Sequence, residues 1–152
     1  LASERYYEAF LSEDRSRAFF HGHTFTGNPV GCQVGLASLA ICREEDTPLR
    51  LESIGARIEA RLHAGLRGDE PLEGLRRTGG IVAFDLIAPG GSGYLSSLQP
   101  ALRRRALEQG VLLRPLGNVV YALPPASTTE EQADRIADAM LDLARYSAVA
   151  ES

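Results

Sequence analysis

The sequence lacks lysine altogether, because all 16 of its basic residues are arginines. This absence excludes any reaction that needs a side-chain amine from this chain. No hydrophobic run approaches the 18 residues of a membrane-spanning helix, and no secretory signal is visible. We therefore expect a cytoplasmic protein that does not bind membranes.

Cysteine and methionine are scarce as well. Cys32 and Cys42 lie in one segment that we predict to be helical, which places them about 15 Å apart along its axis, too far for a disulfide. The chain begins at Leu1, and its one methionine is Met140. We therefore expect a piece of a longer polypeptide.

The remaining composition is that of one globular domain. The chain has 152 residues, of which 44% are hydrophobic and 24% charged, and its net charge is −4. This length is enough to bury roughly 70% of the unfolded surface without a disulfide or a metal. The acidic balance, with one basic run at 103–105, argues against nucleic-acid binding.

Periodicity and turn residues predict a small α/β sandwich, in which helices cover a short, largely antiparallel sheet. A surface helix near residues 6–11 precedes a loop at 12–28. Two helices are predicted at 29–45 and 47–68. A third is capped by Ser96 or Ser97 and ends at Gly110, and a fourth opens with a Thr128–Glu131 capping box and runs to about Tyr146. The predicted strands are 81–87 and a hairpin of 111–114 with 119–123. The helix at 29–45 is rich in small residues, so we expect it to be closely packed on several sides.

The loop at 21–28 is the first candidate site. Its glycines allow a ligand to approach the backbone, Thr24 and Thr26 offer hydroxyl groups, and the next helix is expected to present free N–H groups at its start. Phosphate is the natural ligand, although such a loop taken alone is more often a structural entry turn. His21 and His23 have no third ligand nearby, so we predict no metal site.

Arg114 is the second candidate. It ends a predicted strand beside a turn, where its planar guanidinium group could hold a carboxylate with two hydrogen bonds. Tyr121, on the partner strand, is expected to share the same pocket. Taken alone, Arg114 could also be a surface arginine and Tyr121 a core residue.

Two stretches carry a family resemblance. Residues 21–32 read HGHTFTGNPVGC, and this stretch resembles a segment of the class III pyridoxal-phosphate aminotransferases. Residues 114–125 read RPLGNVVYALPP. They resemble the late motif of the branch that moves an amino group from S-adenosylmethionine to 8-amino-7-oxononanoate in biotin biosynthesis. The resemblance covers essentially the whole chain, as the C-terminal third of such an enzyme.

The resemblance implies a fold and residue roles. It implies the small C-terminal domain of a fold-type I aminotransferase at 29–152, preceded at 1–28 by a remnant of the large cofactor domain. In a homodimer, Thr24, with His23 beside it, would contact the pyridoxal 5′-phosphate of the other subunit. Arg114 would hold a substrate carboxylate, with Tyr121 nearby.

The absence of lysine departs from the family pattern. The central residue of the family is a lysine that forms a Schiff base with the cofactor, and this chain has none. We therefore assign no catalytic residue and expect the chain alone to be inactive. Two alternatives stay open: another class III enzyme acting on an ω-amino acid or an ornithine-type donor, and a non-catalytic α/β module that binds a small carboxylate or a partner protein.

Overall fold

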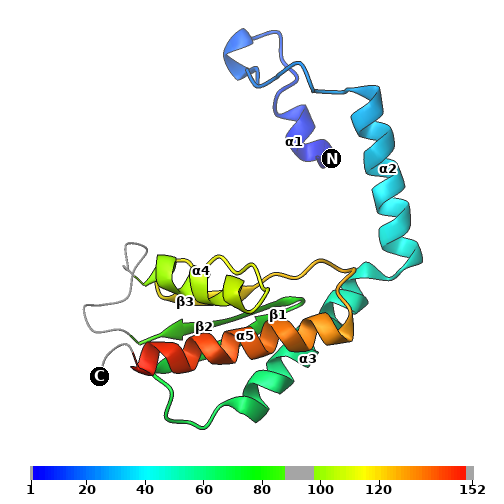
Figure 1. Cartoon of the computed structure of the whole chain (residues 1–152). Coiled ribbons are helices and arrows are strands. Elements are labelled where there is room, and N and C mark those ends of the chain that lie inside the picture. Colours follow the sequence, from blue (N-terminus) through cyan, green and yellow to red (C-terminus); the bar gives the residue numbers. More distant parts are fainter. Residues whose placement is uncertain (1, 88–97, 150–152) are drawn as a thin grey trace. The chain divides into compact units, whose positions relative to one another are not determined.

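A group of helices precedes a mixed helix and strand region along the chain, and a computed structural model describes residues 2–87 and 98–149 (Figure 1). The chain divides into two units, Leu1–Ala40 and Ile41–Ser152, and α2 begins in the first and ends in the second. The elements, in chain order, are α1 (Glu4–Glu8), the 3-10 helix η1 (Arg15–Arg17), α2 (Pro29–Glu44), α3 (Thr47–Gly65), β1 (Leu72–Thr78), β2 (Ile81–Leu86), α4 (Gln99–Glu108), β3 (Val119–Ala122) and α5 (Glu130–Val149).

The sheet of the second unit has the order β1-β2-β3, and both pairs are antiparallel. This confirms the expected antiparallel sheet. A tight turn at Gly79 and Gly80 joins β1 to β2, and Gly79 has a φ of 54°, which favours glycine there. Phe84 on β2 lies opposite Val120 on β3.

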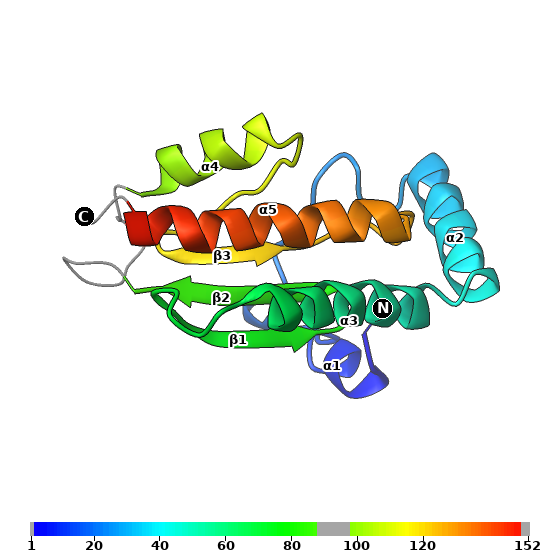
Figure 2. The ribbon, with the colours of Figure 1, turned by 60° about the horizontal axis from the view of Figure 1, so that its bottom comes forward.

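Helices α3 and α5 lie side by side over one face of the sheet (Figure 2). The core between the helices and the sheet contains fully buried Ile58 and Leu62 from α3, Phe84 from β2, and Met140 and Leu143 from α5. Ile58 and Leu62 belong to the apolar stripe that the sequence predicts for this helix. The stripe is confirmed, because each of these side chains faces the sheet or α5.

Outside this core, arginine side chains of α3 and α4 form bidentate ion pairs with aspartates of α5. Arg57 donates two hydrogen bonds to Asp134, at 2.7 and 2.8 Å, and Arg61 donates two to Asp138, at 2.7 and 2.9 Å. The hydrogen bonds from Arg57 hold the pKa of Asp134 below its ordinary value. Arg105 on α4 pairs with Asp142 on α5 in the same way, at 2.6 and 2.9 Å. Bidentate pairing of this kind requires arginine and could not be made by lysine.

The first strand, β1, was not predicted. Its sequence, LEGLRRT, mixes charged residues with a glycine, and a register shift between Glu73 and Arg76 interrupts its pairing with β2. Gly74, with a φ of 63°, lies in this bulge. The strand lies at the edge of the sheet, so its alternating pattern of apolar residues is weak.

The predicted hairpin between 111–114 and 119–123 is wrong in its first strand. Residues 111–115 form no strand, although Val111 and Leu113 are buried, and among the described residues the only pairing of the 111–118 segment with β3 is the bridge between Leu116 and Val119. Leu116 and Val119 exchange both backbone hydrogen bonds at 2.9 Å, but the next hydrogen-bonded pair of an antiparallel ladder, Arg114 with Tyr121, is not formed. Strand β3 pairs instead with β2 along its other edge.

The helix starts differ in detail from the prediction. Asn28 caps α2 as expected, accepting hydrogen bonds from the amides of Val30 at 2.9 Å and Gly31 at 3.2 Å. The capping box of α5 lies one residue later than predicted. The Gln132 amide donates to the Thr129 hydroxyl oxygen, and the Thr129 amide donates to the Gln132 side-chain oxygen. The predicted caps of α4, Ser96 and Ser97, lie outside the described residues.

The expectation that α2 is closely packed is wrong for this chain, since the helix has no buried residue. Its small residues therefore lie at the surface of the described structure. Cys32 and Cys42 both lie on α2 and are free thiols, as predicted.

We predict that Gly55→Ala destabilises the second unit. An alanine Cβ at this buried position of α3 would overlap the carbonyl oxygen of Gly79. We expect the free energy of unfolding to fall by about 1–3 kcal/mol, measured by urea denaturation followed by circular dichroism. Gly35→Ala on α2 is the matched control, because its Cβ would meet nothing within 4 Å. Equal losses in the two variants would contradict the close approach of α3 to the β1–β2 turn.

Candidate functional site

The loop that contains Thr24 is a hydrogen-bonded turn. The Thr26 amide donates to the His23 carbonyl oxygen at 3.0 Å, and the His23 amide donates to the Thr26 hydroxyl oxygen at 3.3 Å. The Phe25 amide donates to His23 Nδ1 at 3.2 Å. After the turn, Gly27 has a φ of 68°. Three bonds therefore fix the backbone on both sides of Thr24.

Thr24 itself remains available to a ligand. The residue is exposed, and within the described part of the chain neither its amide nor its hydroxyl group has a hydrogen-bond partner. Two unpaired donors on one residue of a fixed turn suit a phosphate group. The residues present therefore fit the phosphate of the implied cofactor, although its contact with Thr24 stays a prediction.

The start of helix α2 does not offer the free N–H groups expected from the sequence. Pro29 has no N–H, Asn28 Oδ1 accepts from Val30 and Gly31, and the Cys32 amide donates to the Asn28 carbonyl oxygen at 2.9 Å. The first turn of the helix is thus satisfied internally. Any anion site in this loop has to be made by Thr24 rather than by the helix end.

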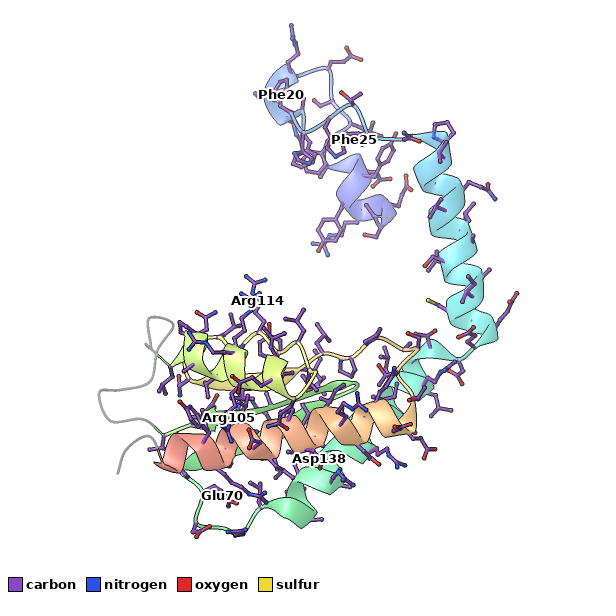
Figure 3. The ribbon with its side chains drawn as sticks, in the orientation of Figure 1. Phe20, Phe25, Glu70, Arg105, Arg114 and Asp138 are labelled. Carbon is purple, nitrogen blue, oxygen red and sulfur yellow. The ribbon has the colours of Figure 1, made fainter. Side chains whose placement is uncertain are left out.

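Aromatic and imidazole rings surround the turn in the first unit. Neighbouring ring centroids are 5.4 Å apart for Phe19 and His21, 6.3 Å for His21 and His23, and 5.8 Å for His23 and Phe25. Phe20 and Phe25 are exposed by 81% and 77% and project from the loop in Figure 3. His23 is therefore held by a ring contact on each side as well as by its hydrogen bonds.

Arg114 lies in the second unit, between two buried residues. Leu113 and Pro115 anchor the segment, while the Arg114 side chain is exposed and points away from the sheet (Figure 3). Among the described residues the Arg114 guanidinium makes no hydrogen bond or ion pair. The geometry leaves all of its donors available for a carboxylate.

Tyr121 is half-buried on β3, opposite Ala83 of β2. Its neighbours Val120 and Ala122 face the core, so Tyr121 lies on the other face of the sheet. The turn at Gly117 and Asn118 connects the Arg114 segment to β3. Arg114 lies two residues before Leu116 and Tyr121 two residues after Val119, the two residues that bridge this turn. No hydrogen bond or ring contact between the side chains of Arg114 and Tyr121 is found in the described part.

Asn118 is a positioning residue that the sequence analysis missed. It is 6% exposed; its side-chain amide donates to the Leu86 carbonyl oxygen at 2.9 Å, and its carbonyl oxygen accepts from the Leu86 amide at 2.9 Å. These bonds attach the turn after Arg114 to the end of β2. An asparagine directly after a turn glycine was the available signal.

A surface groove of the second unit lies next to Arg114 in sequence, being lined by Leu113, but does not include Arg114. Its volume is about 370 Å³, and it is lined by apolar Leu112, Leu123 and Ile136 together with polar Thr128, Gln132 and Arg135. Arg114 and Tyr121 are not among its lining residues, so this groove is not the predicted carboxylate site.

Two further classes of site were searched for in the described ranges. Residues 2–87 and 98–149 contain no group of three or more histidine, cysteine, aspartate or glutamate side chains arranged to hold a metal ion. None of the helices in these ranges is long and apolar enough to cross a membrane.

The family of the chain is established by comparison with known proteins. The family model for class III aminotransferases matches residues 1–143. The chain therefore belongs to the class III aminotransferase family.

Individual relatives show which members of the family the chain is similar to. The chain is 37% identical over 149 residues to the adenosylmethionine-8-amino-7-oxononanoate aminotransferase of Synechococcus elongatus, covering 94% of this chain and 33% of that protein. The crystal structure of the enzyme of that name from Methanocaldococcus jannaschii matches with a TM-score of 0.69 and 31% identity, covering 93% of this chain and 33% of the other.

A different activity appears among the similar structures as well. A PLP-bound amine transaminase from an uncultivated Pseudomonas species matches with a TM-score of 0.73 and 27% identity, covering 88% of this chain and 31% of the other. The fold is thus that of the aminotransferases, as the sequence resemblance implied. The chain spans about a third of the length of the curated relatives it matches.

Proposed function

We propose that this chain forms the C-terminal third of a pyridoxal 5′-phosphate-dependent aminotransferase that transfers the amino group of S-adenosylmethionine to 8-amino-7-oxononanoate in biotin biosynthesis. The observation that carries the proposal is the 37% identity to an enzyme of that name over 94% of the chain. The exposed, unpaired guanidinium of Arg114 within the late motif supports it, because the keto-acid acceptor carries a carboxylate.

The proposal assigns two parts to the chain. Residues 1–28 belong to the large cofactor domain, and residues 29–152 form the small domain. The enzyme is a cytoplasmic homodimer, in which Thr24 of one subunit contacts the cofactor phosphate in the site of the other. The unpaired donors of Thr24 support this role, because no partner within the described residues satisfies them.

The residues of this chain bind and orient rather than perform the chemistry. Bound pyridoxal 5′-phosphate supplies the electron sink through which an amino group passes from donor to acceptor. Thr24 donates hydrogen bonds to a phosphate, Arg114 holds a carboxylate with two parallel hydrogen bonds, and Tyr121, which follows the same turn, lines the substrate site. The chain has no lysine, so it supplies no amine and does not transaminate alone.

The second candidate is another class III activity, with an ω-amino acid or an ornithine-type donor. The similarity to the Pseudomonas amine transaminase supports this candidate at lower identity, 27% against 37%. The two candidates differ in the donor of the amino group, so donor preference separates them.

We predict that the intact protein containing this chain uses S-adenosylmethionine as donor. Purified protein should form 7,8-diaminononanoate from 8-amino-7-oxononanoate, detected by mass spectrometry, while ω-amino acids and ornithine give little product. The reverse preference would support the second candidate. If no lysine-bearing large domain accompanies the chain, a binding module without catalysis replaces both.

For Arg114→Ala, we predict weaker recognition of the carboxylate substrate. Loss of a paired guanidinium costs several kcal/mol, which corresponds to a fall in kcat/KM of about a hundredfold or more for the acceptor. Arg103→Ala is the matched control, since Arg103 is also an exposed arginine without a partner among the described residues. Similar kinetics for the two variants would remove Arg114 from the site.

For Thr24→Val, we predict weaker retention of the cofactor with little change in substrate affinity. Valine keeps the shape of threonine but removes the hydroxyl donor. The dissociation constant for pyridoxal 5′-phosphate, measured by fluorescence after dialysis, should rise by about tenfold, the value of one hydrogen bond to a charged group. Thr24→Ser, which keeps the hydroxyl group, should retain the cofactor. An unchanged constant in Thr24→Val would refute the assignment.

A further inference from the structure

We propose that His23 positions Thr24 through its Nδ1 atom rather than binding the cofactor, and that protonation of His23 breaks its hydrogen bond to the Phe25 amide and weakens phosphate binding. The inference rests on the proposed function, because it gives Thr24 a phosphate to hold. It replaces the direct cofactor contact that the family resemblance implied for His23.

The geometry of the turn carries the proposal. Thr24 is the residue between His23 and Phe25, and the Phe25 amide donates to His23 Nδ1 at 3.2 Å. The ring nitrogen accepts from the amide two residues ahead, as an Asx side chain does. The two other bonds of the turn join His23 to Thr26. All three bonds involve His23, and Thr24 makes none of them.

The hydrogen bond from the Phe25 amide depends on where the His23 ring carries its proton. Nδ1 can accept only when it carries no proton, so this bond requires the neutral ring with its proton on Nε2. Protonation places a second donor against the Phe25 N–H, and the bond between them is lost. The two bonds between His23 and Thr26 do not involve the ring, so protonation removes the one bond that restrains the backbone directly after Thr24.

The surroundings of His23 contain one other titratable ring. His21 lies edge-on to His23 with centroids 6.3 Å apart, and the Phe25 ring lies on the other side at 5.8 Å. Within the described residues no ion pair joins His23 to a carboxylate or an arginine. His21 therefore needs its own control in any pH experiment.

The positioning role and a direct contact predict opposite pH effects. An imidazolium that touches the phosphate attracts it, so a direct contact would tighten cofactor binding as the pH falls. A positioning histidine loses its hydrogen bond on protonation, so cofactor binding weakens. The sign of the pH dependence therefore distinguishes the two roles.

The first experiment examines the turn in the 152-residue chain without cofactor. Long-range ¹H–¹⁵N NMR spectra at pH 7.5 should show His23 with Nδ1 unprotonated, and the Phe25 amide should exchange about tenfold more slowly than in His23→Ala, as expected for one hydrogen bond. At pH 5 this protection should disappear. His23→Asn offers an acceptor oxygen that does not titrate, so it should keep the protection at both pH values.

The second experiment examines cofactor retention in the intact protein. At each pH, the affinity for pyridoxal 5′-phosphate is expressed as a ratio to that of His23→Asn. This ratio should fall between pH 7.5 and pH 5.5 in the wild type and in His21→Asn. This comparison cancels the titration of the cofactor itself. His23→Ala should bind weakly at both pH values.

The outcomes separate the inference from the proposed function. A proton on Nδ1, or unchanged Phe25 exchange in His23→Ala, overturns the positioning role whatever the cofactor data show. Tighter binding in the wild type at low pH overturns it as well, in favour of direct contact. If Thr24→Val leaves cofactor affinity unchanged while the NMR results are as expected, the assigned role of Thr24 fails and the hydrogen bond of His23 stands.

Discussion

The hydrogen bonds along both edges of β2 position the rest of the second unit. Antiparallel pairing with β1 on one side and β3 on the other leaves β2 no free edge, and Val82 and Phe84 are fully buried against the helices. The two bonds between Leu86 and Asn118 extend this attachment beyond the strand. The segment that carries Arg114 is therefore fixed at the turn that follows it, although it forms no strand of its own.

Thr24 and Arg114 are positioned in the same way, by restraint of the backbone on either side of them. Thr24 and Arg114 lie in different units, and each is an unpaired donor group on irregular backbone whose neighbours are bonded or buried. Around Thr24 the restraint comes from His23, and around Arg114 it comes from Leu113, Pro115 and Asn118. Local restraint of this kind reduces the entropy lost when a ligand is bound. The backbone that carries a ligand-binding side chain can thus be ordered while the side chain itself remains solvated.

The sequence predicted most of the regular structure but not the irregular parts of the site. The stripe with Ile58 and Leu62 and the Asn28 cap were predictable because helical periodicity and capping are local. Strand β1 was missed since its pairing across a bulge at Gly74 depends on β2. The role of His23 as a hydrogen-bond acceptor was not visible either, because it depends on backbone angles in a turn that no periodicity describes. The family motifs indicated Thr24 and Arg114, whereas the environment of each became apparent only in the structure.

The paired arginines of α3 also limit how α5 can align along α3. Arg57 and Arg61 are four residues apart, as are their partners Asp134 and Asp138, and Arg61 is already 3.9 Å from Asp134. Sliding α5 by one turn, about 5.4 Å, would pair Arg61 with Asp134 and Arg57 with Glu130, to which Arg57 already donates a hydrogen bond at 2.6 Å. The charges alone therefore allow two alignments of nearly equal merit. The choice between them falls to uncharged contacts, such as Gly65 against Leu141, where an added methyl group would find no room.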